Sequence, residues 1–151
     1  MNHPVHHITD AKLHGMYSMR KQNRFANLLL ERGVQKGDKV GILLMNCLEW
    51  LPIYFGILKT GALAVPLNFR YSADEIKYCV RTGGCRYFSV RTGIYRTCGG
   101  DCGRYRKRKT SVFCRRWLPG ICRDYTSHTA NCSSQSPKID IVDEDDAAIY
   151  F

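Results

Sequence analysis

Hydrophobic and polar positions alternate with a helical period over residues 18–33. The apolar members of this stretch are Phe25, Ala26, Leu28 and Leu29. Ser18 is placed to cap the start of a helix, and Gly33 suits the left-handed position that follows a helix end. The pattern therefore predicts a helix from residue 18 to residue 33.

The next segments alternate between strand-like and helix-like patterns. Residues 39–45, "KVGILLM", are nearly all apolar, which is typical of a strand covered on both faces of a parallel sheet. Asn46 is an expected N-cap, with Glu49 in the capping-box position, and the helix that it opens should cover residues 47–60. Residues 62–68, "ALAVPLN", then predict a second short buried strand.

A third helix is predicted to follow, over residues 73–80. Ser72 and Glu75 have the spacing of a capping box before "ADEIKYCV". Strand, helix and strand with short connections make a βαβ unit, which is almost always right-handed. The predicted fold class is therefore α/β with mostly parallel strands.

The regular pattern ends after Val80. Residues 81–124 contain only five Ile, Leu, Val or Met side chains, and we expect this segment to be irregular or disordered. They hold twelve basic and two acidic residues, which accounts for the whole formal net charge of +10, and five of the eight cysteines. The excess charge is therefore a property of one segment.

Four regions follow from these patterns. Residues 1–17 are expected to be a flexible tail, residues 18–80 the βαβ part, and residues 81–124 an aberrant Arg/Cys-rich segment. Residues 125–151 begin with a polar, loop-like stretch up to Pro137. They end with acids and the start of a buried strand, Ile149–Phe151.

The sequence gives no sign of export or membrane insertion. Residues 1–17 lack the apolar core of a signal peptide. The longest apolar run, residues 50–58, is far shorter than the roughly 20 residues of a membrane helix. We therefore expect a cytoplasmic, reducing location.

A family resemblance appears in residues 23–80. The turn "GVQKGDKV", the strand "GALAVPLN" and the helix start "SADE" occur in the order and spacing of the AMP-forming adenylating enzymes. "DEDDAAIYF" at the end of the sequence is similar to the same family, which includes acyl-CoA synthetases. The region 18–80 thus resembles part of the AMP-binding N-terminal domain of the adenylate-forming fold, and the acyl-CoA synthetase branch is the most similar.

The resemblance implies an ATP-dependent carboxylate–CoA ligase that uses Mg²⁺ and coenzyme A. Its substrate would be a carboxylic acid such as a fatty acid. In this family a phosphate-binding loop follows the strand that starts at residue 149, and the other functional residues come later. No catalytic, cofactor-binding or metal-binding residue can therefore be carried over to this sequence. We expect the 151-residue chain to be inactive by itself.

The same resemblance offers an explanation for residues 81–124. Codons for "RTGGCRYF", Arg81–Phe88, can be chosen so that a one-base shift encodes Glu-Leu-Ala-Asp-Ala-Asp-Ile, which resembles the family. We predict a frameshift from about Arg81 to about Asp124.

Two other functions remain as alternatives. The run "RYRKRK", Arg104–Lys109, favours a small basic nucleic-acid-binding protein that would use residues 81–124. The other alternative is an adaptor whose helix at residues 47–60 docks on a full-length relative. A specific nucleic-acid partner is not predicted, because clustered charge alone gives only non-specific affinity.

Four further sets of residues invite a binding site, and each has a simpler explanation. Cys98, Cys102, Cys114 and Cys122 lack the paired spacing of a zinc site. His3, His6, His7 and His14 could bind nickel or copper adventitiously. Trp50, Tyr54 and Phe55 could touch an acyl group but fit a protein core better. Consecutive acids, Asp143–Asp146, are typical of a solvated turn.

Overall fold

Helices and strands alternate along the described part of the chain, which in this computed structural model comprises residues 8–45, 47–85, 87–91, 110–114, 123–142 and 147. Side chains are described for residues 15–45, 47–85, 125–142 and 147. In chain order the elements are α1 (Ile8–Glu31), β1 (Lys39–Leu43), α2 (Trp50–Leu58), β2 (Leu63–Pro66), α3 (Ala73–Thr82), β3 (Tyr87–Arg91), β4 (Thr110–Cys114), β5 (Arg123–Asp124) and α5 (Tyr125–Ala130).

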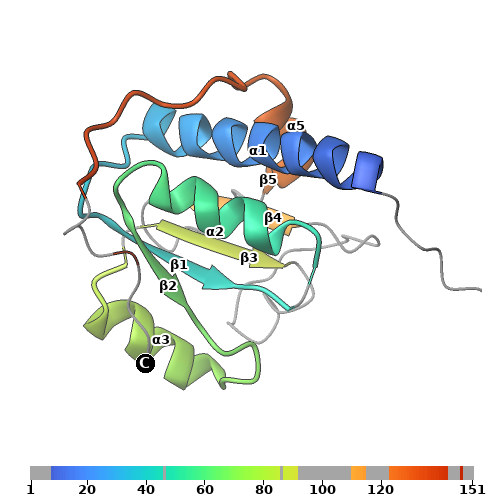
Figure 1. Cartoon of the computed structure of the whole chain (residues 1–151). Helices are drawn as coiled ribbons and strands as arrows, with labels where there is room; N and C mark the ends of the chain where they lie inside the picture. Colours follow the sequence, from blue (N-terminus) through green and yellow to red (C-terminus); the bar gives the residue numbers. More distant parts are fainter. Residues whose placement is uncertain are drawn as a thin grey trace, which may run out of the picture.

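The strands form one mixed sheet of order β2-β1-β3-β4-β5 (Figure 1). β1 pairs in parallel with β2 on one side and with β3 on the other, so that Val40 lies between Ala64 and Tyr87. β3 with β4 and β4 with β5 are antiparallel. The predicted βαβ unit is present as β1-α2-β2, and the α/β fold class is confirmed.

Alternation along β1 and β2 divides their apolar residues between the two faces of the sheet. Val40 and Ile42 of β1 and Ala64 of β2 are buried in one cluster with residues of α1 and α2. Leu43 and Val65 are buried in a second cluster with Ile76 and Cys79 of α3, together with Leu67. Because successive strand residues point to opposite faces, a continuous apolar strand can supply both clusters. The result is a sheet with α1 and α2 on one face and α3 on the other (Figure 1).

Helix α1 ends as the sequence predicts but begins earlier. Gly33 has φ +82°, and Val34 N–H donates to Leu29 C=O at 3.0 Å, the pattern of a Schellman end. At the other end, residues 8–17 are helical although we expected them to be a flexible tail. Ser18 therefore lies inside the helix and does not cap it. Residues 8–17 contain no proline that would end the helix before Ser18, and the helix extends through them.

Helix α2 starts later than predicted. Its N-cap is Glu49, whose side chain makes no capping hydrogen bond, and its first residue is Trp50. Pro52 explains the difference. A proline is tolerated in the first turn of a helix, but a helix beginning at residue 47 would place it in the interior, where it clashes with the preceding turn. Asn46, the predicted cap, lies outside the described residues.

The Arg/Cys-rich segment 81–124 also differs from the expectation of irregular structure. Helix α3 continues to Thr82, and β3, β4 and β5 lie within the segment. Tyr87–Val90, "YFSV", is rich in residues that favour strands, and β1 offers it an edge with which to pair. Gly83, Gly84 and Cys85 are also described, and the remaining residues of the segment lie outside the described part of the chain.

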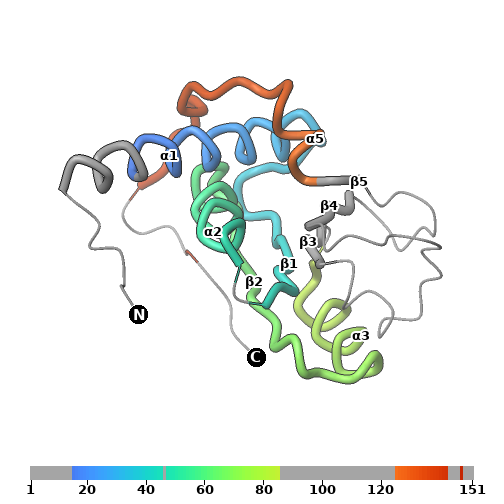
Figure 2. The backbone as a smooth tube through the Cα atoms, turned by 90° about the vertical axis from the view of Figure 1, so that its right-hand side faces the viewer, coloured from blue at the N-terminus to red at the C-terminus, as the bar shows by residue number. Residues whose placement is uncertain are grey.

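The polar stretch predicted as a loop begins with a short helix, α5, and then runs beside α1 (Figure 2). We call residues 133–140 the strap. Asn27 Nδ2 donates to the carbonyls of Ser133 at 2.8 Å and Gln135 at 3.0 Å, and Asn23 Nδ2 donates to that of Ser134 at 2.9 Å. Tertiary contact with α1 therefore orders a stretch that local patterning could not identify.

Three more contacts fix this part of the chain. The ring of Tyr125 in α5 lies 5.6 Å from that of Phe25, centroid to centroid. Lys36 Nζ donates to the carbonyl of Asp140 at 3.1 Å. Beyond the strap, the carbonyl of Ala147 accepts a hydrogen bond from Ala64 N–H at 3.1 Å, at the outer edge of β2. The segment after residue 125 is thus tied to both α1 and the sheet.

Candidate functional site

The turn after β2 is a natural place for a ligand, because in parallel sheets ligands bind beyond the carboxyl ends of the strands. Asn68 Oδ1 accepts from Arg70 N–H at 2.9 Å, and the Asn68 carbonyl accepts from Tyr71 N–H at 3.1 Å. The Arg70 guanidinium lies 5.6 Å from the centroid of the Phe69 ring. Both carbonyl groups of Asn68 are therefore engaged in closing the turn.

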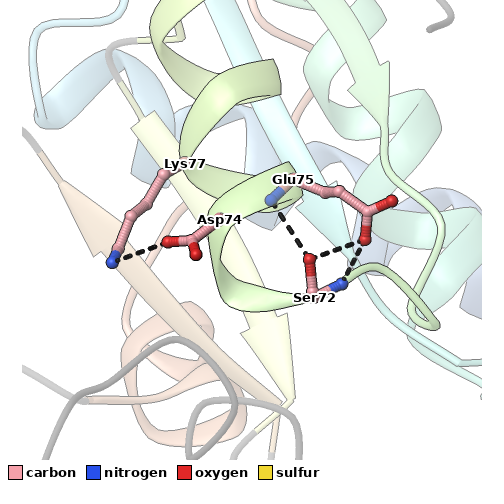
Figure 3. A network of polar contacts seen from close by, with 4 residues as sticks. All are labelled: Ser72, Asp74, Glu75 and Lys77. Carbon is pink, nitrogen blue, oxygen red and sulfur yellow. Dashed lines mark hydrogen bonds and ion pairs between the residues drawn. The ribbon is translucent and has the colours of Figure 1, made fainter.

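Ser72 and Glu75 form the polar network at the start of α3 (Figure 3). Glu75 Oε2 accepts from Ser72 N–H and from Ser72 Oγ, each at 2.7 Å, and Ser72 Oγ accepts from Glu75 N–H at 3.3 Å. A serine beside a carboxylate could suggest a nucleophile with its base. These hydrogen bonds lower the pKa of Glu75, the side-chain bond from Ser72 most of all, which makes it a weaker base. The pair is the predicted capping box.

The aromatic residues of α2 belong mainly to the core. Trp50 and Tyr54 are stacked with their ring centroids 5.2 Å apart, and both pack against the buried cluster below α1. The rings of Phe55 and Tyr54 are T-shaped, with their centroids 5.6 Å apart, but Phe55 leaves 42% of its surface exposed. The core interpretation therefore holds for the first two residues, whereas Phe55 faces outward.

A polar cluster that the sequence analysis missed lies between α1 and α5. Arg32 Nη2 is 3.2 Å from His128 Nδ1, and Cys132 Sγ is 3.7 Å from Glu31 Oε2. Burial, and then the negative charge of Glu31, raise the pKa of Cys132. The thiol is therefore held in its protonated, unreactive form. Both contacts join residues about 100 positions apart, so no local spacing in the sequence signalled the cluster.

Most of the other candidate residues lie outside the described part of the chain. These are His3, His6, His7, Cys98, Cys102, Cys122, Arg104–Lys109 and Asp143–Asp146. For His14 in α1 and Cys114 in β4, only the backbone is described. Within the described residues, no three His, Cys, Asp or Glu side chains gather in a way that could hold a metal ion.

Two properties of the described residues bear on the setting of the protein. None of the helices there combines the length and the apolar character needed to cross a membrane. None of the four cysteine side chains that the structure describes, Cys47, Cys79, Cys85 and Cys132, forms a disulfide bond. Burial raises the pKa of Cys85 to about 11, although the charge of Lys39 acts in the opposite direction.

The family model described as "AMP-binding enzyme" matches residues 19–150. The chain belongs to this family. The matched range extends from α1 through the βαβ unit to the strap.

Curated relatives in the family match a shorter stretch. The medium/long-chain-fatty-acid–CoA/3-oxocholest-4-en-26-oate–CoA ligase of Mycolicibacterium smegmatis is 48% identical over 58 residues, 38% of this chain and 10% of that protein. The long-chain-fatty-acid–CoA ligase FadD13 of Mycobacterium tuberculosis is 38% identical over 64 residues, 42% of this chain and 13% of that protein. The chain thus matches only about a tenth of the length of these relatives.

Solved structures show the same fold. Brucella canis acyl-CoA synthetase superposes with a TM-score of 0.72 at 18% identity, over 88% of this chain and 24% of that one. The anthranilate CoA ligase AuaEII, solved with anthranoyl-AMP, gives 0.71 at 22% identity, over 87% and 24%. The adenylate-forming fold assignment is confirmed. The expectation that this chain carries no catalytic, cofactor-binding or metal-binding residue stays a prediction.

Proposed function

We propose that the chain is a portion of an ATP-dependent, AMP-forming carboxylate–CoA ligase, with a fatty acid as its substrate class, and that it does not catalyse this reaction by itself. The family match over residues 19–150 supports the first part. The names of the relatives, which are fatty-acid–CoA ligases, favour the substrate class.

The proposed reaction of the parent enzyme has two steps. The carboxylate attacks the α-phosphorus of ATP and releases pyrophosphate, and the thiol of coenzyme A then displaces AMP from the acyl adenylate. The first step needs magnesium and cationic or N–H groups to stabilise the charge on the phosphates. ATP, Mg²⁺ and coenzyme A are therefore the expected cofactors of the full-length enzyme.

The turn after β2 supports the proposal of inactivity, because its backbone N–H groups are already engaged. A phosphate-binding loop presents several backbone N–H groups to the anion. At the carboxyl edge of β2, the N–H groups of Arg70, Tyr71, Ser72 and Glu75 already donate within the turn and the capping box. We therefore derive no catalytic step on these residues.

A pyrophosphate-release assay tests the proposal. The 151-residue chain is incubated with ATP, Mg²⁺, coenzyme A and a panel of fatty and aryl acids, with the Mycolicibacterium smegmatis ligase as positive control. We expect no pyrophosphate above background from the chain. Turnover, or tight stoichiometric ATP binding by calorimetry, would show that the chain has its own nucleotide site.

We also propose that residues 81–124 are encoded out of frame with their flanks. The contacts of the strap with Asn23 and Asn27 support this, because they join residues more than 100 positions apart across the aberrant segment. Sequencing the coding DNA tests the proposal. One uninterrupted frame, with codons that cannot be shifted into a family-like sequence, would contradict it.

Nucleic-acid binding by the same 151-residue chain tests the alternative function. Its basic run, Arg104–Lys109, lies outside the described residues. The nucleic-acid alternative requires a complex with DNA or RNA that prefers a particular base sequence at about 150 mM salt. Incidental charge instead gives an affinity for nucleic acid that falls steeply with salt and shows no sequence preference.

A further inference from the structure

Helix α2 carries no charged side chain between Trp50 and Leu58, and its only polar side-chain atoms belong to Trp50 and Tyr54, yet one side of it faces solvent. Its buried side consists of Pro52, Ile53, Gly56 and Ile57. A helix that is apolar on all sides is normally enclosed by protein. The exposed side of α2 is therefore a surface whose composition suits an interior.

We define the outer face of α2 by four exposed side chains in and just before the helix. They are Met45, Leu48, Leu51 and Phe55, with exposed fractions of 44%, 86%, 56% and 42%. Leu51 and Phe55 are four residues apart and therefore lie on the same side of the helix. The charged neighbours lie at the two ends, Glu49 before the helix and Lys59 after it, and Lys59 Nζ donates to Asn23 Oδ1 at 2.8 Å.

The rest of α2 holds this face rigidly in place. Gly56 sits so close to α1 that an added Cβ would lie 2.8 Å from the Phe25 ring. The stack of Trp50 on Tyr54 fixes the flank of the helix, and Tyr54 in turn contacts the Phe55 ring. A preorganised patch of aromatic and leucine side chains with a charged rim has the composition of a protein interface.

The related structures supply a candidate occupant for the face. This unit superposes on about a quarter of an acyl-CoA synthetase chain, so in those proteins the same fold is accompanied by three times as much additional polypeptide. A second copy of this chain is a poorer occupant, because each copy carries a formal net charge of +10 and two copies would repel one another.

We propose that the outer face of α2 is a docking surface for the remaining body of an acyl-CoA synthetase, supplied by a separate chain. The inference rests on the proposed function, because it takes the partner from the same enzyme class. It goes further by naming the surface, its residues and a partner in trans.

Co-purification with a truncated synthetase tests the proposal. The tagged 151-residue chain is co-expressed with Brucella canis acyl-CoA synthetase lacking the quarter that superposes on this chain. We expect a one-to-one complex. Leu51→Asp and Phe55→Asp should each weaken it by about 30-fold or more, as expected for a buried charge at an anchor position. Tyr78→Asp on α3, at a side chain that is 66% exposed, is the matched control and should leave it unchanged.

The native segment of the Brucella canis enzyme, expressed as a separate chain, is the positive control. If that segment binds the truncated enzyme and this chain does not, the proposal fails. It also fails if the Asp variants bind as well as the wild type, or if they abolish only self-association of this chain.

If the native segment also fails to bind, the same substitutions are measured in a chimera in which this chain replaces that segment. Phe55→Asp should then lower the melting temperature of the chimera more than that of the free chain, and an equal effect in both overturns the proposal. Pyrophosphate release is recorded separately. A complex without turnover counts against the proposed function alone, and absence of a complex counts against the docking surface alone.

Discussion

Gly56 is the residue that allows α1 and α2 to pack closely. A Cβ at this position would lie 2.8 Å from Phe25 Cδ1 and 3.0 Å from the Gln22 carbonyl oxygen, and the backbone oxygen cannot move aside without shifting α1. We predict that Gly56→Ala lowers the free energy of unfolding by about 1–3 kcal/mol, which is typical of an overpacked core.

Gly15→Ala is the control for this substitution. Gly15 lies in α1 with nothing within 4 Å of an added Cβ, so alanine should leave the stability unchanged or raise it by up to about 1 kcal/mol. Urea unfolding followed by circular dichroism measures both variants. Equal effects would show that the close contact at Gly56 contributes little.

Ser72 controls both the start of α3 and the ionisation of Glu75. We predict that Ser72→Ala lowers stability at pH 7 by about 1 kcal/mol, since it removes an N-cap. It should also raise the pKa of Glu75 toward 4.5, because the largest cause of the lowered pKa is the side-chain bond from Ser72. An NMR titration of the Glu75 carboxyl measures the shift.

The stability of the folded chain should depend on pH through Glu75. The pKa of Glu75 is lower in the folded than in the unfolded chain, so its contribution to stability is present above about pH 4.5 and is lost as the pH falls through the lowered pKa. Ser72→Ala should reduce this loss. An unchanged Glu75 titration in the variant would contradict the role of the cap.

Cys85 should react slowly in the folded chain. With a pKa of about 11, roughly one thiol in a thousand is ionised at pH 8, and thiolate is the reactive form. We predict that iodoacetamide at pH 8 modifies Cys85 roughly 100-fold more slowly in buffer than in 8 M urea, where the thiol regains an ordinary pKa. Peptide mass spectrometry follows this residue separately. Similar rates in the two solvents would show that burial does not control the thiol.

At the level of elements, the strap depends on two asparagines of α1. Asn23 and Asn27 together donate three hydrogen bonds to carbonyls of residues 133–135. Each hydrogen bond contributes about 1 kcal/mol. We predict that replacing both asparagines by alanine releases the strap and speeds its cleavage by a non-specific protease.

Gln22→Ala is the matched control for the strap. Its side chain donates to Ser18 Oγ within α1 at 3.3 Å and does not depend on the strap. Cleavage of this variant should follow the wild type. The hypothesis is wrong if the asparagine variant and the control are cut at the same rate.

The elements that the sequence predicted best are those whose burial is expressed in their own composition. β1 and β2 are apolar runs, and α3 begins with a capping box, so each could be located without knowing the fold. The start of α2 could not, because an N-cap pattern at Asn46 conflicted with Pro52, and the geometry of the proline decides the matter. α5 could not either, because Tyr125 is buried against Phe25 of α1 and not through a local pattern.

The candidate site shows a similar limit. The sequence alone singled out the aromatic residues of α2 but could not separate the core stack of Trp50 and Tyr54 from the outward Phe55. The Glu31–Cys132 contact joins residues about 100 positions apart, so no spacing rule reveals it.

At the level of the whole molecule, α1 contacts both α5 and the strap, so the first and last thirds of the described chain lie together. Limited trypsin digestion should cut first at arginines between Arg91 and Arg123, in the basic segment. We predict that the two flanking pieces then remain associated through α1, α5 and the strap and elute together in gel filtration. Gel electrophoresis of the eluted peak shows whether both pieces are present. Separate elution under native conditions would mean that the flanks do not form one folding unit.

The hydrogen bond from Ala64 N–H to the Ala147 carbonyl has a consequence for self-assembly. β2 is the outermost strand on its side of the sheet, and an uncovered outermost strand invites neighbouring molecules to add to it, which is a route to fibrils. A shorter polypeptide ending before residue 147 would leave that amide vacant. Shortening by a few residues would thus promote fibre growth although every buried side chain of the core is retained.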